Sequence, residues 1–104
     1  MATVLIKYKT EEKYTYEQVV KMMEDSANNT FKGLPHLHSK QFCFDIETGE
    51  GLSIYLWDSK EIAQAYFTPE WEVYFEKKFG CTAHITYYDT ILTLDNRMND
   101  IIYG

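Results

Sequence analysis

Residues 51–96 read GLSIYLWDSKEIAQAYFTPEWEVYFEKKFGCTAHITYYDTILTLDN, and this stretch decides the fold. It starts with a strand-like run, Ser53 to Trp57, and passes through a polar joint into a helix-like run from Ser59 to Phe67. The pattern predicts a break at Thr68-Pro69 and a new helix from Pro69 to Phe79. Proline suits the first turn of a helix but disfavours a helical conformation in the residue before it.

The end of this stretch returns to strand-like alternation. Gly80 is a typical helix stop, and the alternating residues from Ala83 to Leu94 predict one further strand. We therefore expect residues 51–96 to form a strand, a broken helix and a strand.

The first half of the chain repeats the same order. Ala2 to Lys9 alternate with the two-residue period of a strand. Thr15, with Gln18 three residues later, matches a capping box and predicts the start of a helix. Gly33-Leu34-Pro35 predicts the end of this helix. One apolar stripe at helical spacing runs through Tyr16, Val19, Val20, Met23 and Ala27.

A hairpin then connects two central strands. Alternation resumes at His36, and Glu47 to Gly51 form a loop into the strand Leu52 to Trp57. The order is β-α-β-β-α-β. It predicts a single α+β, ferredoxin-like domain over residues 1–104, with a four-stranded antiparallel sheet and both helices on one face.

The second face of such a sheet is left uncovered by helices. Depending on the register, it exposes Tyr8, Cys43, Tyr55, Trp57, Tyr88 or their neighbours. An aromatic surface of this size marks an association site, so we expect a homodimer formed by sheet-to-sheet packing. The apolar C-terminal segment, Arg97 to Gly104, is expected to pack on the partner subunit.

Composition excludes several kinds of partner. The net charge is −6 over 104 residues, with a sequence pI near 4.9, which argues against nucleic acid and anionic membranes. No apolar run approaches the roughly 20 residues that span a bilayer, and Met1 to Val4 lack the layout of a signal peptide. We expect a cytoplasmic protein in which Cys43 and Cys81 are buried thiols and not a disulfide.

Five short motifs occur together in the second half: Tyr55-Leu56-Trp57-Asp58-Ser59, Ala63 to Trp71, Phe79-Gly80, Tyr88-Asp89 and Asp95-Asn96. In this order they resemble the dimeric α/β-barrel (ferredoxin-like) superfamily, within it the group of small proteins to which monooxygenase activity is ascribed. The resemblance implies two subunits whose sheets close into a barrel, with a small-molecule cavity between sheet and helices in each subunit.

The same resemblance suggests which reactions the protein catalyses. Some members oxidise aromatic or quinol-like compounds with molecular oxygen and without metal or flavin, whereas others degrade haem or have no established activity. The related proteins usually carry a glycine pair before the Tyr-Leu-Trp run, where this chain has Leu52-Ser53. Bulk at this point is expected to alter the cavity and its ligand.

The candidate site residues are a histidine and a group of aromatic side chains. His84 is the candidate catalytic base, although a structural role fits the same pattern. The aromatic residues are either ligand contacts or core and dimer packing. The substrate-binding candidates are Trp57, Tyr66, Phe67, Trp71 and Tyr88. His36 and His38 share a strand face and would need His84 to complete a metal site, so we favour a solvated strand start and expect no metal and no cofactor.

These residues lead to one functional hypothesis and two alternatives. The first is cofactor-independent oxidation of a small aromatic or quinol-like molecule in the cavity, with His84 removing the substrate proton. The alternatives are a non-catalytic small-molecule-binding or stress-response dimer, and a haem-handling protein.

Overall fold

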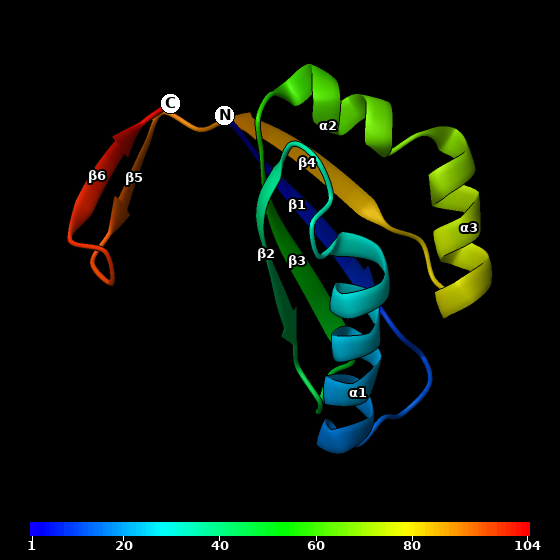
Figure 1. Cartoon of the computed structure of the whole chain (residues 1–104). Coiled ribbons are helices and arrows are strands. Elements are labelled where there is room, and N and C mark those ends of the chain that lie inside the picture. The colour runs from blue at the N-terminus through cyan, green and yellow to red at the C-terminus, as the bar shows by residue number, and fades with distance from the viewer.

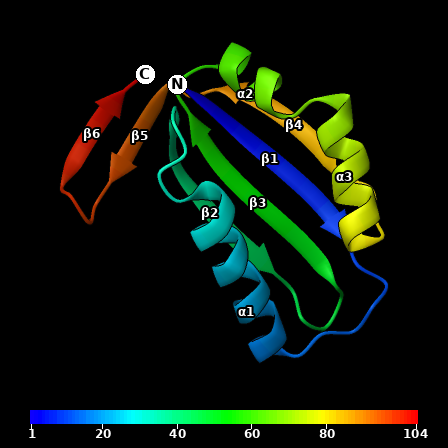
Figure 2. The same ribbon diagram turned by 45° about the vertical axis from the view of Figure 1, so that its right-hand side comes forward.

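A computed structural model describes residues 1–104, and its main sheet has the expected ferredoxin-like topology. Four antiparallel strands lie in the order β2-β3-β1-β4, and three α-helices lie on one face of this sheet (Figures 1 and 2). None of the helices has the length and apolar character needed to cross a membrane. The elements are β1 (Ala2–Lys9), α1 (Tyr16–Ser26), the π-helical turn η1 (Ala27–Phe31), β2 (Leu37–Phe44), β3 (Glu50–Trp57), α2 (Lys60–Tyr66), α3 (Pro69–Phe79), β4 (His84–Asp89), β5 (Leu92–Asp95) and β6 (Asp100–Tyr103).

The expected helix signals are confirmed. Thr15 and Gln18 form a reciprocal capping box at the start of α1. The hydroxyl of Thr68 accepts a hydrogen bond from the Trp71 N–H at 3.1 Å, so α3 begins directly after the break at Pro69. Gly80 adopts a left-handed conformation with φ 70° and ends α3. Side-chain caps therefore set the starts of α1 and α3, and the backbone conformation of Gly80 sets the end of α3.

The register of the strands decides which side chains meet the helices. Val4 lies opposite Tyr55 on β3 and opposite Tyr87 on β4. Val4 and Tyr55 are buried beneath the helices, and the Tyr55 ring lies 5.1 Å from that of Phe67 between ring centroids. Tyr8 also faces the helices, because its ring packs on Phe75.

The open face of the sheet is therefore less aromatic than the sequence allowed. Tyr8, Tyr55 and Trp57 lie on the helical face, and of the residues expected on the open face only Cys43 and Tyr88 are exposed. The centre of the open face is instead aliphatic. Partly exposed side chains of β1 and β3 form it: Leu5, Leu52, Ile54 and Leu56.

The prediction of a single strand from Ala83 to Leu94 was wrong. The run from Ala83 to Leu94 divides into β4, which ends at Asp89, and β5, which leaves the main sheet. The reason lies in β1, since it begins at Ala2, the register partner of Asp89, and offers no partner beyond that point. β5 pairs with β6 in a separate hairpin that projects away from the main sheet (Figures 1 and 2).

Candidate functional site

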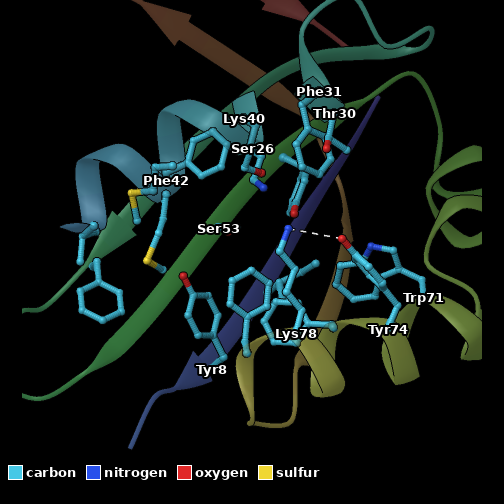
Figure 3. A pocket seen from close by; sticks show the side chains of 18 of the residues that line it. Tyr8, Ser26, Thr30, Phe31, Lys40, Phe42, Ser53, Trp71, Tyr74 and Lys78 are labelled. Carbon is cyan, nitrogen blue, oxygen red and sulfur yellow. Dashed lines mark hydrogen bonds between the residues drawn. The ribbon is translucent and has the colours of Figure 1, made fainter. Parts of the chain in front are cut away.

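A cavity of about 300 Å³ lies between the helical face of the sheet and helices α1 and α3 (Figure 3). Strands β1, β2 and β3 form its floor, and the wide turn η1 and Tyr66 of α2 complete its walls. Fourteen of its twenty lining residues are hydrophobic, and many of these are aromatic. A cavity of this kind suits a flat organic molecule of small size.

Lys40 is the unusual residue in this cavity. It occupies an inward position of the edge strand β2, on the same face as Phe42 and Phe44, where an apolar residue is the normal choice. Its Nζ lies 3.8 Å from the ring centroid of Phe31, 4.0 Å from that of Phe42 and 4.7 Å from that of Tyr55. No carboxylate lies within ion-pair distance of it.

This environment changes the proton affinity of Lys40. Burial disfavours the charged form and lowers the pKa of the amino group from 10.5 to about 7. The three ring faces attract an ammonium group and offset part of the desolvation. Lys40 is thus able to accept or release a proton near neutral pH, inside an aromatic cavity.

The π-helical turn η1 places one of these rings. The Lys32 N–H donates to the Ala27 carbonyl at 2.7 Å, which closes a wider loop than an α-helical bond does. The turn brings Phe31 over Lys40 and within 6.2 Å of Tyr66, measured between ring centroids. Phe31 therefore links the end of α1 to α2 and covers the amino group.

Helix α3 supplies the opposite wall. Trp71, Phe75 and Phe79 form a continuous row of rings, with 5.3 Å and 4.7 Å between successive centroids. Lys78 is exposed at the rim, and its Nζ donates a hydrogen bond to the Tyr74 hydroxyl at 3.3 Å (Figure 3). The cavity thus has one partly buried lysine and one exposed lysine at its mouth.

The tyrosine hydroxyls of the floor are neutral hydrogen-bonding groups. Burial raises the pKa of Tyr8 to about 12 and also raises the pKa of Tyr55. At neutral pH both side chains keep their protons, so they can orient a ligand but cannot act as its base.

The structure brings together only some of the predicted site residues. Tyr66 and Trp71 line the cavity. Trp57 and Phe67, which are 2% and 5% exposed, lie behind them in the core, where Trp57 contacts Tyr66 with 5.2 Å between ring centroids. Tyr88 is 53% exposed on the open face of the sheet, away from the cavity.

His84 also lies on the open face. It pairs in register with Lys7 and lines a shallow hollow with Lys7 and Cys43. The sheet separates this hollow from the cavity, so His84 is not placed to remove a proton from a ligand there. Both cysteines are free thiols, and Cys43 is exposed and not buried as expected.

His36 and His38 meet a carboxylate that their spacing did not reveal. The Asp58 side chain lies between them and bonds to His36 Nδ1 at 2.8 Å and to His38 Nε2. These two hydrogen bonds lower the pKa of Asp58. His84 lies toward the opposite end of the sheet, because it pairs with Lys7, whereas Asp58 follows the partner of Ala2. No group of three or more His, Cys, Asp or Glu residues is arranged to hold a metal ion.

The pair Leu52-Ser53, at which bulk was expected to alter the cavity, does not fill it. Ser53 is buried and lines the cavity with a small side chain, whereas Leu52 points to the open face. Gly51 is under a tighter constraint, because a Cβ there would lie 2.1 Å from Cζ of Tyr8. The position that excludes a side chain is thus Gly51, the residue before Leu52-Ser53.

The cavity residues that the sequence analysis did not single out are Lys40, Lys78 and Phe31. A signal for Lys40 was present, since it shares the two-residue period of Phe42 and Phe44. Lys78 and Phe31 carried no comparable signal, because their roles depend on how α1 and α3 face one another.

Comparison with known proteins supports the fold. No family model matches the sequence, and no curated protein matches it. Among solved structures, the chain is similar to a 1.40 Å crystal structure of a putative antibiotic biosynthesis monooxygenase from Deinococcus radiodurans. The two share 13% identity and a TM-score of 0.59 over 86% of this chain and 92% of that chain. At this identity the likeness shows a shared ferredoxin-like α+β fold.

Proposed function

We propose that this protein oxidises a small phenolic aromatic molecule with molecular oxygen, without metal or flavin, in the cavity between the sheet and the helices. The observation that carries the proposal is the amino group of Lys40, which lies among three aromatic rings with no carboxylate partner. The description of the Deinococcus protein as a monooxygenase is consistent with this chemistry on the same fold.

The aromatic walls bind the ring of the substrate. Phe31, Tyr66 and Trp71 each offer a ring surface to the cavity. Flat rings pack against such side chains in offset or edge-to-face arrangements. The hydroxyl groups of Tyr8 and Tyr55 are available to orient polar substituents, since burial keeps them protonated.

Lys40 is the proposed base. Its neutral amine accepts the proton of the phenol, and the resulting ammonium stabilises the phenolate beside it. Because the pKa of this amine is lowered to about 7, the neutral form is accessible at physiological pH. We assign the base to Lys40 instead of His84, which faces the other side of the sheet.

The remaining steps need no external reductant. The phenolate gives one electron to dioxygen, and the phenoxyl radical and superoxide combine at a ring carbon ortho or para to the oxygen. The Lys40 ammonium returns its proton to the peroxide. Loss of the ring C–H proton then breaks the O–O bond, and the released hydroxide takes up this proton to become water. The phenol and dioxygen thus yield a quinone and water, with one oxygen atom in each.

We also propose that two copies associate through the open faces of their sheets. The aliphatic centre of that face, formed by Leu5, Leu52, Ile54 and Leu56, is partly exposed in the isolated chain. The β5–β6 hairpin adds exposed apolar residues, and a two-stranded hairpin alone is marginally stable in water. A partner surface would stabilise both. The two free thiols suit the reducing cytoplasm that we propose as the location.

Oxygen consumption with a panel of phenols and hydroquinones tests the function. Wild-type protein should consume oxygen with its substrate, and one atom of ¹⁸O₂ should enter the quinone. Lys40→Met should abolish the uptake, while Lys77→Met, which removes a charge outside the cavity, should preserve it.

Two results would contradict the proposal. One is wild-type uptake no greater than that of buffer. The other is unchanged uptake by the Lys40→Met variant. Ligand binding without oxygen uptake would favour the non-catalytic binding alternative, and a shift of the haem absorption band on adding haemin would favour haem handling.

A further inference from the structure

The distribution of charge in the cavity differs from that of the whole chain. The protein has 16 acidic residues against 10 lysines and arginines, yet none of the residues that line the cavity is Asp, Glu or His. Two of them are lysines, Lys40 from strand β2 of the floor and Lys78 from helix α3, and both project into the cavity (Figure 3). The cavity therefore carries lysines and no carboxylate within an acidic protein, which favours an anionic group on the ligand.

The two lysines have different surroundings. Lys40 is enclosed by rings, whereas Lys78 is exposed at the mouth. The one polar contact of Lys78 is the hydrogen bond that it donates to the Tyr74 hydroxyl.

Lys78 also lacks a carboxylate partner. Lys21, Lys60 and Arg97 each lie within ion-pair distance of an aspartate, but Lys78 does not. The residues three and four positions before it on α3 are Phe75 and Tyr74, so its own helix supplies no counter-charge. An exposed lysine is positively charged at neutral pH. The mouth of the cavity therefore presents a cation and a phenolic hydroxyl that are free to bind an anion.

We propose that the aromatic ligand of this cavity carries a carboxylate, and that Lys78 and the Tyr74 hydroxyl bind this group at the mouth. The phenol end of the same molecule then faces Lys40, an orientation that rests on the proposed function. The ligand class is the hydroxyaryl carboxylic acids. A carboxylate accepts charge-assisted hydrogen bonds from an ammonium and a hydroxyl, which are stronger than neutral ones.

The test compares an acid with its neutral ester under anaerobic conditions, where no oxidation takes place. The probes are 6-hydroxy-2-naphthoic acid and its methyl ester, and the measurement is the dissociation constant by titration calorimetry. Wild-type protein should bind the acid roughly fivefold more tightly than the ester, the upper end of what an exposed ion pair contributes. High salt should reduce this preference, because Lys78 is exposed to solvent.

Three variants locate the effect. Lys78→Gln should remove the preference for the acid, and Lys78→Arg should retain it. Lys77→Gln removes the same charge from the neighbouring residue of α3, which does not line the cavity, and should leave the preference intact. Equal binding of acid and ester by the wild-type protein overturns the proposal. The proposal is also overturned if the preference for the acid survives in Lys78→Gln or disappears in Lys77→Gln.

The result is independent of catalysis. A preference for the acid without oxygen uptake supports the carboxylate site and refutes the oxidation. Oxygen uptake without a preference for the acid supports the oxidation and refutes the carboxylate site. If neither probe binds to the wild-type protein, the carboxylate proposal fails.

Discussion

Replacement of Lys40 by methionine should stabilise the protein, and by more at acidic than at alkaline pH. Methionine keeps an unbranched, flexible side chain but carries no charge. The pKa of Lys40 falls from 10.5 to about 7 on folding. Between these values the unfolded chain holds a proton that the folded protein releases. The stability of the wild-type protein therefore rises with pH across this window, and that of the variant lacks this contribution.

The contacts of Lys40 set the size of the effect. A fall from 10.5 to about 7, at about 1.36 kcal/mol for each pKa unit, corresponds to about 5 kcal/mol for charging the buried amine. That lowered pKa already belongs to an amine that lies among the rings of Phe31, Phe42 and Tyr55. We therefore expect Lys40→Met to raise the free energy of unfolding by about 5 kcal/mol at pH 6 and by about 1 kcal/mol at pH 10.

Urea unfolding followed by tryptophan fluorescence measures this difference, since Trp57 and Trp71 lie in or beside the core. The wild-type protein, Lys40→Met and Lys77→Met are compared at pH 6, 8 and 10. Lys77→Met removes an exposed charge and should follow the wild-type curve. The reasoning is refuted if the free energies of wild type and Lys40→Met differ by the same amount at every pH, or if the variant is the less stable at pH 6.

Three further changes test other parts of the structure. Gly51→Ala places a Cβ 2.1 Å from Cζ of Tyr8 and should lower the free energy of unfolding by about 1–3 kcal/mol in urea; a variant as stable as wild type would contradict the close approach. Deleting Asn99 to Gly104 removes β6 and should shift sedimentation toward the monomer, whereas unchanged sedimentation would exclude the hairpin from the dimer. Thr68→Ala removes the acceptor for the Trp71 N–H and should cost about 1 kcal/mol in thermal unfolding, while Thr68→Ser should not.

Local signals in the sequence were enough to predict the order of the elements. Thr15 begins a helix because its hydroxyl bonds to the Gln18 N–H, and Gly80 ends one because it adopts a left-handed conformation. Both partners of such a contact lie within a few residues of each other, so the sequence pattern predicts it. The end of β4 has no local cause, since it depends on where β1 begins. The expected strand therefore ran on to Leu94.

The site was harder to predict for a similar reason. Alternation shows which residues share a face of a strand, but the register and the helices decide which face is covered. His84 and Tyr88 were expected at the ligand and instead lie on the open face. Tyr66 and Trp71, which flank the break at Pro69, do line the cavity, and their contact with a ligand stays a prediction.

The length of the π-helical turn η1 affects the shape of the cavity and therefore the ligands that it can bind. The turn holds Phe31 above Lys40 through a loop one residue longer than an α-helical one. Removing one residue would close the turn to the narrower loop of an α-helix and shift the backbone that carries Phe31. If this shift moved the Phe31 ring off the amino group, the amine would become more hydrated and more basic. A single-codon deletion could thus change both the shape and the acid–base behaviour of the cavity, while the four-stranded sheet remained intact.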